Sequence, residues 1–381
     1  MSARFTKIAL ILGLFLSLSG CQHRLIKQPL PAVPLKWSQW GGHSRENFYI
    51  PTQEKLSGLK LVKTIKLFSS PGKTLLISGD VLFVPTLDGK LTTFSLRTFK
   101  KIGQVKLPQK LAGTAALTHN DLIVALRFGK KSLFLLNPLT GKKVWTTELG
   151  SIQTEPLISS PRIFVTTLYK GIVAIDDSTG KILWEKHLPA QSHSSPNLIQ
   201  NRLIFGDDRG NLRAVKPSTA DSLWTVSIGG IIRAMPVGNN GRVYIGTTAG
   251  NFFAVDAKTG RILWKFSVQA RIFHEAAVAP GGVFFVANDG FLYKLSPETG
   301  RLLWKRSLNG VAGTPPLVYG NRILLGTLEH LLLLIDRTSG KITQEIKLKG
   351  RVHTLPIITQ KYVIAGSEKQ WLYIFEKEHI R

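Results

Sequence analysis

The sequence has one cysteine among 381 residues, few acidic side chains and, beyond its first twenty positions, no helical periodicity. A single sulfur excludes an intrachain disulfide framework and a zinc site built from cysteines. The 23 Asp and Glu are outnumbered by 50 Lys and Arg, so the net charge is +27 and few carboxylates are available for a hard cation. Hydrophobic residues make up 43% of the chain, which is enough to bury a core and argues against disorder.

Residues 1–20 have the pattern of a signal peptide. Arg4 and Lys7 precede an apolar run, Ile8–Leu18, which is too short to span a membrane. The run ends in Leu-Ser-Gly before Cys21, which resembles a bacterial lipobox. That resemblance implies cleavage before Cys21 and acylation (palmitate or a similar chain) of its sulfur and new amino terminus. Gln22 at the next position favours the outer membrane, facing the periplasm. The alternative is an ordinary signal peptide followed by an incidental cysteine.

The segment after Cys21 predicts a tether. Removal of residues 1–20 leaves a charge of about +25. Pro29, Pro31 and Pro34 fall in a stretch without periodicity, Gln22–Pro34, so we expect an extended connection between the lipid and the fold. The lipidated tether and lead-in are expected over 21–57. No second apolar stretch is long enough to cross a membrane.

A repeat of about 40 residues dominates the rest of the chain. Thr140 begins a Thr-Gly-basic-hydrophobic-hydrophobic-Trp unit that recurs with little change. Gln344 stands 40 residues after Trp304, at the position where the other units have tryptophan. Gly103 and Lys63 stand at the same position in two less regular copies upstream. Eight anchors result. The tryptophans at this phase are Trp145, Trp184, Trp224, Trp264 and Trp304.

Each unit predicts four short β-strands separated by turn residues, which is the pattern of a propeller blade. The last unit, Val352–Phe375, contains three strands, and Leu61–Leu67 is a fourth strand with none before it. We therefore predict an all-β fold, an eight-bladed β-propeller of four-stranded blades closed by pairing of the N-terminal strand with the C-terminal blade. Closure hides strand edges that would otherwise template aggregation. The expected limits are 58–376 for the propeller and 377–381 for a tail.

The repeated tryptophans and Thr-Gly pairs are interpreted as structural. A large ring at a fixed phase is typical of packing between adjacent blades. The glycines supply positive φ in turns, and no helix follows them, so they are not phosphate loops.

The Thr-Gly-Lys-hydrophobic-hydrophobic-Trp unit resembles the quinoprotein-type, or PQQ-like, propeller repeat over roughly Trp37–Phe375. The lead-in Trp37–Arg45 is similar to that family's usual beginning. A lipobox followed by eight such blades resembles the outer-membrane protein assembly lipoproteins of the BamB family. That resemblance implies a scaffold that faces the periplasm, docks on the BamA component of the machine that folds β-barrels, and performs no chemistry.

The resemblance also implies two partner-contact loops, before the prolines of adjacent blades. They fall at Leu188–Ser192 and Ile231–Arg233. Here the first reads Pro189-Ala190-Gln191, and the second has Arg233 where the family pattern has an acid.

An enzymatic alternative follows from the shared fold, because PQQ-dependent dehydrogenases are also eight-bladed. That family's site needs Ca²⁺ held by Glu, Asn and Asp oxygens, an Asp base and a vicinal disulfide. Cys21 is alone, acids are scarce, and the chain is too short for the insertions that cover the quinone. We expect no catalytic residues, no metal and no cofactor. No Gly-x-Ser-x-Gly motif indicates a hydrolase.

One set of positions is predicted to border the central channel. The residue three positions before each blade's proline should start the innermost strand. Gln153, His193, Arg233 and His353 are the polar candidates for a channel rim that binds a partner. They could hold a carboxylate or phosphate, or form only a solvated rim. The full set of eight is Lys73, Gly113, Gln153, His193, Arg233, Phe273, Gly313 and His353.

The positive charge favours anionic partners through long-range attraction. With a lipid anchor, these would be envelope lipid or polymer, and nucleic acid is not expected. A protein partner, the membrane through the anchor, and a monomer within a complex are the predicted associations. The alternative is a basic surface with no dedicated ligand.

Overall fold

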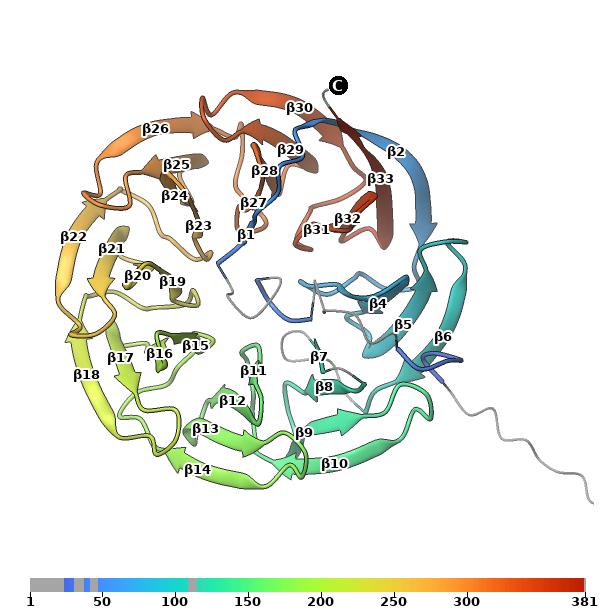
Figure 1. Cartoon of the computed structure of the whole chain (residues 1–381), viewed down its shortest axis with the longest axis horizontal. Helices are drawn as coiled ribbons and strands as arrows, with labels where there is room; N and C mark the ends of the chain where they lie inside the picture. Colours follow the sequence, from blue (N-terminus) through green and yellow to red (C-terminus); the bar gives the residue numbers. More distant parts are fainter. Residues whose placement is uncertain (1–23, 31–37, 42–46, 109–114, 119, 380–381) are drawn as a thin grey trace, which may run out of the picture.

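The computed structural model describes residues 24–30, 38–41, 47–108, 115–118 and 120–379. Eight small β-sheets surround a central channel (Figure 1), so the fold is the predicted eight-bladed β-propeller. No helix occurs in the described part of the chain, and none of its segments is therefore a helix long and apolar enough to cross a membrane. The predicted signal peptide and Cys21 lie outside the described residues.

The blades are numbered here in chain order, each from its innermost to its outermost strand. Blade 1 is β3 (Leu76–Ser78), β4 (Val81–Pro85), β5 (Lys90–Ser95) and β6 (Lys101–Lys106); blade 2 is β7 (Ala116–Leu117), β8 (Leu122–Ala125), β9 (Lys131–Leu136) and β10 (Lys143–Glu148); blade 3 is β11 (Leu157–Ser159), β12 (Arg162–Thr167), β13 (Gly171–Asp176) and β14 (Ile182–Lys186); blade 4 is β15 (Asn197–Ile199), β16 (Arg202–Gly206), β17 (Asn211–Val215) and β18 (Ser222–Ser227).

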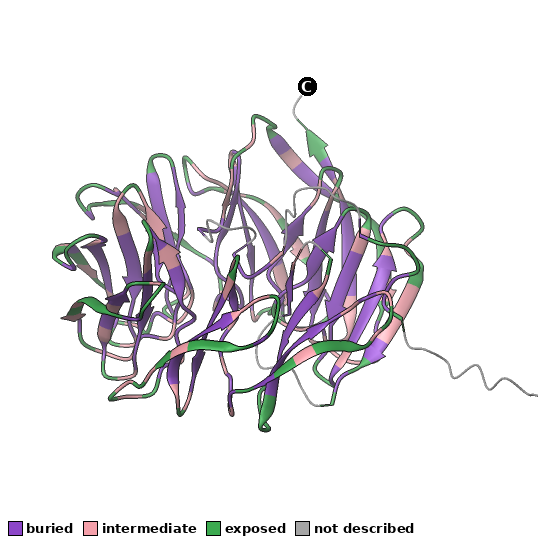
Figure 2. Cartoon of the chain, turned by 60° about the horizontal axis from the view of Figure 1, so that its bottom comes forward, coloured by how far each residue is buried: buried purple, intermediate pink, exposed green. Residues whose placement is uncertain are grey.

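The second half of the ring follows the same plan. Blade 5 is β19 (Val237–Asn239), β20 (Arg242–Gly246), β21 (Asn251–Asp256) and β22 (Ile262–Ser267); blade 6 is β23 (Ala277–Ala279), β24 (Gly282–Val286), β25 (Phe291–Leu295) and β26 (Leu302–Ser307); blade 7 is β27 (Leu317–Tyr319), β28 (Arg322–Gly326), β29 (Leu331–Asp336) and β30 (Ile342–Lys347), with β1 (Tyr49–Ile50) added; blade 8 is β31 (Ile357–Ile358), β32 (Tyr362–Ser367), β33 (Trp371–His379) and β2 (Leu56–Lys66). Inner strands are buried, and exposed residues gather on outer strands and loops (Figure 2).

The ring closes through β2, as predicted. β2 is the outermost strand of blade 8 and runs antiparallel to β33, from the pair Leu56–His379 to the pair Lys66–Trp371. Both strands are longer than expected. The propeller therefore begins at Leu56 rather than at 58, and residues 377–379 belong to β33 rather than to a tail.

The tryptophans pack at the seams, meaning the contacts between the outer strand of one blade and the next blade. Trp224 Nε1 donates to the Ala257 carbonyl of blade 5 at 3.0 Å. A Cβ at Gly260, in the Thr-Gly turn of that blade, would lie 2.8 Å from the Trp224 ring. Gly260 also has φ +76°. Gly180, Gly260, Gly300 and Gly340 lie against the tryptophan of the preceding blade in this way, because a turn residue without a Cβ leaves room for the ring. The equivalent hydrogen bonds are made by Trp145, Trp184 and Trp264 to the carbonyls of Asp177, Pro217 and Pro297.

The seam between blades 1 and 2 lacks its tryptophan and is filled by the N-terminal segment. Gly103 pairs with Thr93 in the register that a tryptophan holds elsewhere. The backbone of Arg24 and Leu25 covers Gly103, where a Cβ would lie 2.0 Å from the Arg24 carbonyl oxygen. Leu25 N donates to the Pro138 carbonyl at 2.9 Å, in the turn position that accepts from the indoles of other seams. Arg24–Leu30 therefore packs against blades 1 and 2, which corrects the expectation of a free tether over Gln22–Pro34.

Two further seams use other residues. Lys63 holds the tryptophan register of blade 8, and the facing turn of blade 1 has Phe99 at φ 56°, whose ring meets Tyr362 at 5.5 Å. At the seam between blades 7 and 8, Gln344 donates to the Leu59 carbonyl at 2.9 Å and accepts from Leu59 N at 2.8 Å. The amide thus binds the closing strand directly.

Two described parts of the lead-in, residues 38–41 and Asn47–Ile50, bond to innermost strands of the ring. Leu117 N of blade 2 donates to the Ser38 carbonyl, and Val278 N of blade 6 donates to the Asn47 carbonyl. β1 then pairs in parallel with β27, so blade 7 has five strands instead of the predicted four. Ser38, Asn47 and β1 thus supply hydrogen-bond partners to backbone N–H groups on the edges of the innermost strands, which would otherwise face the channel unpaired.

We predict that Leu25→Ala with Ile26→Ala destabilises the protein by about 2–5 kcal/mol, because both side chains are buried and the seam has no tryptophan to refill it. Thermal and denaturant unfolding of the chain from Gln22 onward would measure the loss. Leu302→Ala with Leu303→Ala, at exposed positions of β26, is the matched control and should change stability little. Equal stability of the Leu25/Ile26 variant and this control would show that Leu25 and Ile26 do not stabilise the seam between blades 1 and 2.

Candidate functional site

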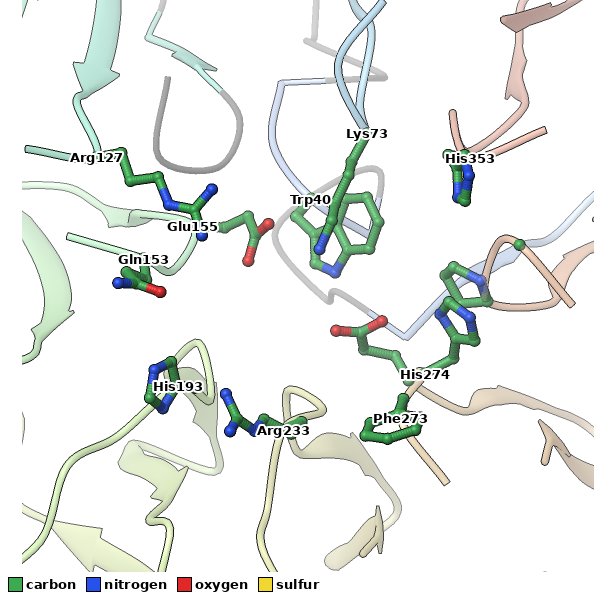
Figure 3. A pocket seen from close by; sticks show the side chains of 13 residues that line it. Trp40, Lys73, Arg127, Gln153, Glu155, His193, Arg233, Phe273, His274 and His353 are labelled. Carbon is green, nitrogen blue, oxygen red and sulfur yellow. The ribbon is translucent and has the colours of Figure 1, made fainter. Parts of the chain in front are cut away.

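A cavity of about 490 Å³ opens at the channel end that is bordered by the loops leading into the innermost strands. We call this opening the mouth. Figure 3 shows side chains from several blades converging on it, with Lys73, Arg127 and Glu155 directed toward its middle. The cavity is lined by Trp40, Lys73, Arg127, Gln153, Glu155, His193, Arg233, Phe273, His274, Glu275, Gly313, Pro315 and His353.

The structure brings the sequence-predicted rim residues together. Gln153, His193, Arg233 and His353 all line the mouth, as do Lys73, Phe273 and Gly313 of the same phase. Gly113 lies outside the described residues. The expected position needs one correction: these residues precede the innermost strands rather than start them. For example, Arg233 lies four residues before Val237, where β19 begins.

Two glutamates reach the mouth, and both accept hydrogen bonds. Glu155 accepts a hydrogen bond from Ser195 Oγ at 2.5 Å and comes from the loop before blade 3. Glu275 is buried and accepts from the Met235 backbone N–H at 3.3 Å. Burial, and then the negative charge of Glu155, raise the pKa of Glu275 to about 7. Glu275 is thus half-protonated near neutral pH.

The three histidines of the mouth differ in their surroundings. His193 Nδ1 lies 2.9 Å from an oxygen of Asp208, so its ring is engaged by a carboxylate. Burial lowers the pKa of His274 to about 4, and its Nε2 contacts the Ala312 carbonyl at 3.3 Å. Burial also lowers the pKa of His353. His274 and His353 are therefore weak candidates for cations at neutral pH.

The permanent positive charge of the mouth comes from Lys73, Arg127 and Arg233. None of the three takes part in a salt bridge within the described part of the chain, although Arg127 stacks over the Phe128 ring. These three cations outnumber the two carboxylates of the lining, and Glu275 is partly protonated, so the mouth carries an excess of positive charge. It can hold an anionic group by charge-assisted hydrogen bonds.

The sequence analysis missed four lining residues, Trp40, Arg127, His274 and Pro315, and the first two come from outside the loops that precede the innermost strands. Trp40 arrives with the lead-in segment, which has no place in the repeat, and packs edge-on against Phe48 at 5.7 Å. Arg127 comes from the turn between the second and third strands of blade 2, where other blades carry different residue types. The only available signal for Trp40 was the lead-in motif that begins at Trp37.

A family model described as outer membrane protein assembly factor BamB matches residues 129–230, 208–315 and 288–379, which together cover more than half of the chain. The chain belongs to the BamB family. Its fold is similar to the crystal structure of BamB from Moraxella catarrhalis, with a TM-score of 0.72 and 18% identity over 84% of this chain and 100% of that one.

Dehydrogenases share the same architecture as this BamB-family chain. A europium-containing methanol dehydrogenase matches with a TM-score of 0.73 and 12% identity, over 89% of this chain and 98% of that one. Quinohemoprotein alcohol dehydrogenase from Comamonas testosteroni matches at 0.74 and 14%, over 91% of this chain and 81% of that one. At these identities the likeness is one of fold. No curated protein matches the chain.

The mouth of this BamB-family propeller does not fit the metal–quinone centre that the dehydrogenase fold would imply. A hard cation needs several converging oxygen ligands. Only Glu155 and Glu275 supply carboxylates to the cavity, and no group of three or more His, Cys, Asp or Glu suited to a metal occurs among the described residues. Lys73, Arg127 and Arg233 occupy the same space and would repel a cation.

We predict a pH-dependent stability difference for Glu275→Gln. The folded protein keeps the Glu275 proton up to about pH 7, whereas the unfolded chain releases it near the ordinary value of 4.5. The contribution of Glu275 to the free energy of unfolding therefore falls as pH rises between these values. Glutamine still accepts from Met235 N–H, so the variant should gain about 1–3 kcal/mol over the parent above pH 7.

Denaturant unfolding between pH 4 and 8 would measure this difference. The gain in stability of Glu275→Gln should vanish below about pH 4.5, where the parent is protonated in both states. Glu345→Gln, on the exposed face of β30, should give no pH-dependent gain in stability. A constant difference across the range would contradict the assigned pKa.

Proposed function

We propose that this protein is a non-enzymatic scaffold lipoprotein of the bacterial envelope that assists the assembly of outer-membrane β-barrel proteins. The family match over residues 129–379 carries the proposal. The mouth supports it, because its cationic lining does not fit the centre of a dehydrogenase. We place the protein at the outer membrane, facing the periplasm, with Cys21 as the lipidated residue.

The proposed docking surface lies on the loops before blades 4 and 5. Leu188–Ser192 and Ile231–Arg233 lie at the mouth end, each fixed by a repeated bond: Asp208 N donates to the Gln191 carbonyl, and Thr248 N donates to the Ile231 carbonyl. Pro189 and Gln191 are exposed, and Ile231 is half-buried. Two rigid loops on neighbouring blades present a continuous edge to a protein partner, which we propose is a BamA-like assembly component.

We predict that Gln191→Glu with Ile231→Glu abolishes capture of that component from gently solubilised envelopes. Added negative charge and loss of an apolar contact at the centre of an interface should weaken binding at least tenfold, an effect of about 1.4 kcal/mol or more. Pull-down with the intact lipidated chain, followed by identification of the retained proteins, measures the outcome.

The matched control is Arg271→Glu with Arg351→Glu. These residues hold the same loop position on blades 6 and 8, where Asn288 N and Glu368 N donate to their carbonyls. The control changes the net charge more than the test variant does, yet should retain the partner. Absence of any β-barrel assembly component from the parent's pull-down would sink the proposal.

The cationic mouth supports a second candidate function, the binding of an anionic group of a partner or envelope polymer. Lys73 and Arg233 are the groups that carry it, in place of the sequence-based pair Arg233 and His353, because both keep their charge while partial burial lowers the pKa of His353.

For this second function, we predict that the parent protein binds inorganic phosphate or acetate by titration calorimetry, and that Lys73→Ala with Arg233→Ala reduces affinity about tenfold or more. Lys258→Ala with Arg261→Ala, which removes the same charge at exposed positions outside the mouth, should bind as the parent does. Undiminished binding by the double variant would remove the mouth from consideration.

A further inference from the structure

Four large apolar side chains protrude from loop tips of blades 1–3 and from the loop that leads into blade 1. Phe68 is 88% exposed, Tyr169 74%, Leu87 57% and Phe128 56%. We call these four residues the apolar tips. The other exposed large apolar residues, such as Leu223 and Leu302, lie on outermost strands and are 39–49% exposed, apart from Val144 at 55%.

The apolar tips share one end of the ring, the mouth end. Leu87 N donates to the Ser70 carbonyl, in the loop that holds Phe68, and Leu168 N donates to the Ser151 carbonyl of the loop before blade 3. Such bonds join the turn after each blade's second strand to the loop bordering the mouth. At the position of Phe128 and Tyr169, the turns of blades 4–8 carry Arg209, Ala249, Asp289, Glu329 and Lys369. The apolar arc is therefore confined to one side of the ring.

The rings of the apolar tips stand apart from one another. Among the described residues, Phe68, Phe128 and Tyr169 stack on no other aromatic ring. A small cavity of about 180 Å³ borders Phe68 but none of the other three tips. A bilayer accepts such separate side chains, because each can dip into its interfacial layer beside the others.

Basic side chains flank the apolar tips. Lys66, Arg127, Lys130 and Lys131 are exposed beside Phe68 and Phe128 in the sequence. Lys349 and Lys369 hold the neighbouring loops of blade 8, where Lys66 Nζ donates to the Lys369 carbonyl. Two nearby acids are paired, Asp88 with Lys90 at 2.5 Å and Glu185 with Lys170 at 3.1 Å, while exposed Glu148 lies opposite Lys131 in the ladder of blade 2. Aromatic and leucine tips among unneutralised lysines fit an anionic lipid surface.

The N-terminal segment meets the ring on the same blades. The backbone carbonyl of Arg24 accepts a hydrogen bond from Gln104 N of β6, in blade 1, at 3.1 Å. Cys21 lies three residues earlier, so an acyl chain on its sulfur would leave the ring within about 10 Å of that point. An anchor beside blade 1 would lie on the same side of the ring as the apolar tips of blades 1–3.

We propose that the apolar tips Phe68, Leu87, Phe128 and Tyr169 insert into the interfacial layer of an anionic membrane and set the orientation of the propeller on it. This proposal rests on the proposed envelope location, but not on the docking of an assembly component. The rival occupant of this surface is a protein partner.

The chain from Gln22 onward tests the proposal, because it contains every described residue and no cysteine. Single cysteines at Phe68→Cys, Phe128→Cys and Tyr169→Cys carry an environment-sensitive nitrobenzoxadiazole label. The probe is a vesicle made of equal parts phosphatidylcholine and phosphatidylglycerol. We expect a blue-shifted, brighter emission at all three positions, and none at the control positions Leu223→Cys and Leu302→Cys on blades 4 and 6. Labels that stay unchanged on sedimented, protein-bearing vesicles would overturn the proposal.

A loss-of-binding series gives a second readout. Phe68→Ala with Phe128→Ala and Tyr169→Ala should weaken sedimentation with these vesicles about tenfold or more, whereas Leu223→Ala with Leu302→Ala and Leu303→Ala should not. Vesicles of phosphatidylcholine alone should bind less of the parent protein, and salt should weaken binding to the anionic vesicles. If the triple variant kept full vesicle binding but lost the assembly component in the pull-down, the tips would belong to the protein interface and the membrane proposal would fail. Vesicle binding without capture of any component would instead count against the proposed function alone.

Discussion

Pairing of β2 with β33 is the interaction on which the other blades depend. A blade packs only against its two neighbours, so an open ring would leave two blades with one seam each and a bare strand edge. The strands come from opposite ends of the propeller sequence, and the cost of bringing distant segments together grows only slowly with chain length. The long antiparallel ladder between Leu56 and Lys66 offsets that cost. Gln344 reinforces it by bonding both backbone groups of Leu59.

The forty-residue rhythm predicted the regular seams but not the irregular ones. Trp224 and Gly260 recur at fixed spacing because each blade repeats the same contact with the next, so a local pattern records a tertiary interaction. Gly103 breaks the pattern, and the residues that repair it, Leu25 and Ile26, lie far outside the repeat. No periodic signal marks such a repair. The prolines near Leu25 predicted an extended connection, and nothing in their pattern indicated that Leu25 and Ile26 are buried.

In the mouth, too, the repeat predicted the residues that recur in every blade but not those that lie outside it. Residues of one phase in each blade must converge near the axis, because rotation about that axis relates the blades. This reasoning found Gln153, His193 and Arg233 without coordinates. It could not find Trp40, which enters with the lead-in segment. Nor could it assign charge states, since the pKa of Glu275 depends on burial and on Glu155, which comes from a blade on another side of the cavity.

The departures from symmetry are concentrated on adjoining blades, which also carry Phe68, Leu87 and Phe128, whereas Tyr169 lies in a turn of blade 3 that adjoins Leu188. The seams from blade 7 to blade 2 use Gln344, Phe99 and Leu25 in place of tryptophan, and the N-terminal segment docks among them. The seams from blade 2 to blade 5 carry hydrogen-bonded tryptophans and hold the loops at Gln191 and Ile231 between rigid neighbours. Because each blade transmits strain mainly to the next, a change at the apolar tips of blades 1 and 2 leaves the loops at Gln191 and Ile231 largely intact. A propeller built in this way can rest one side of its mouth end against a membrane while the other side presents fixed loops to a protein.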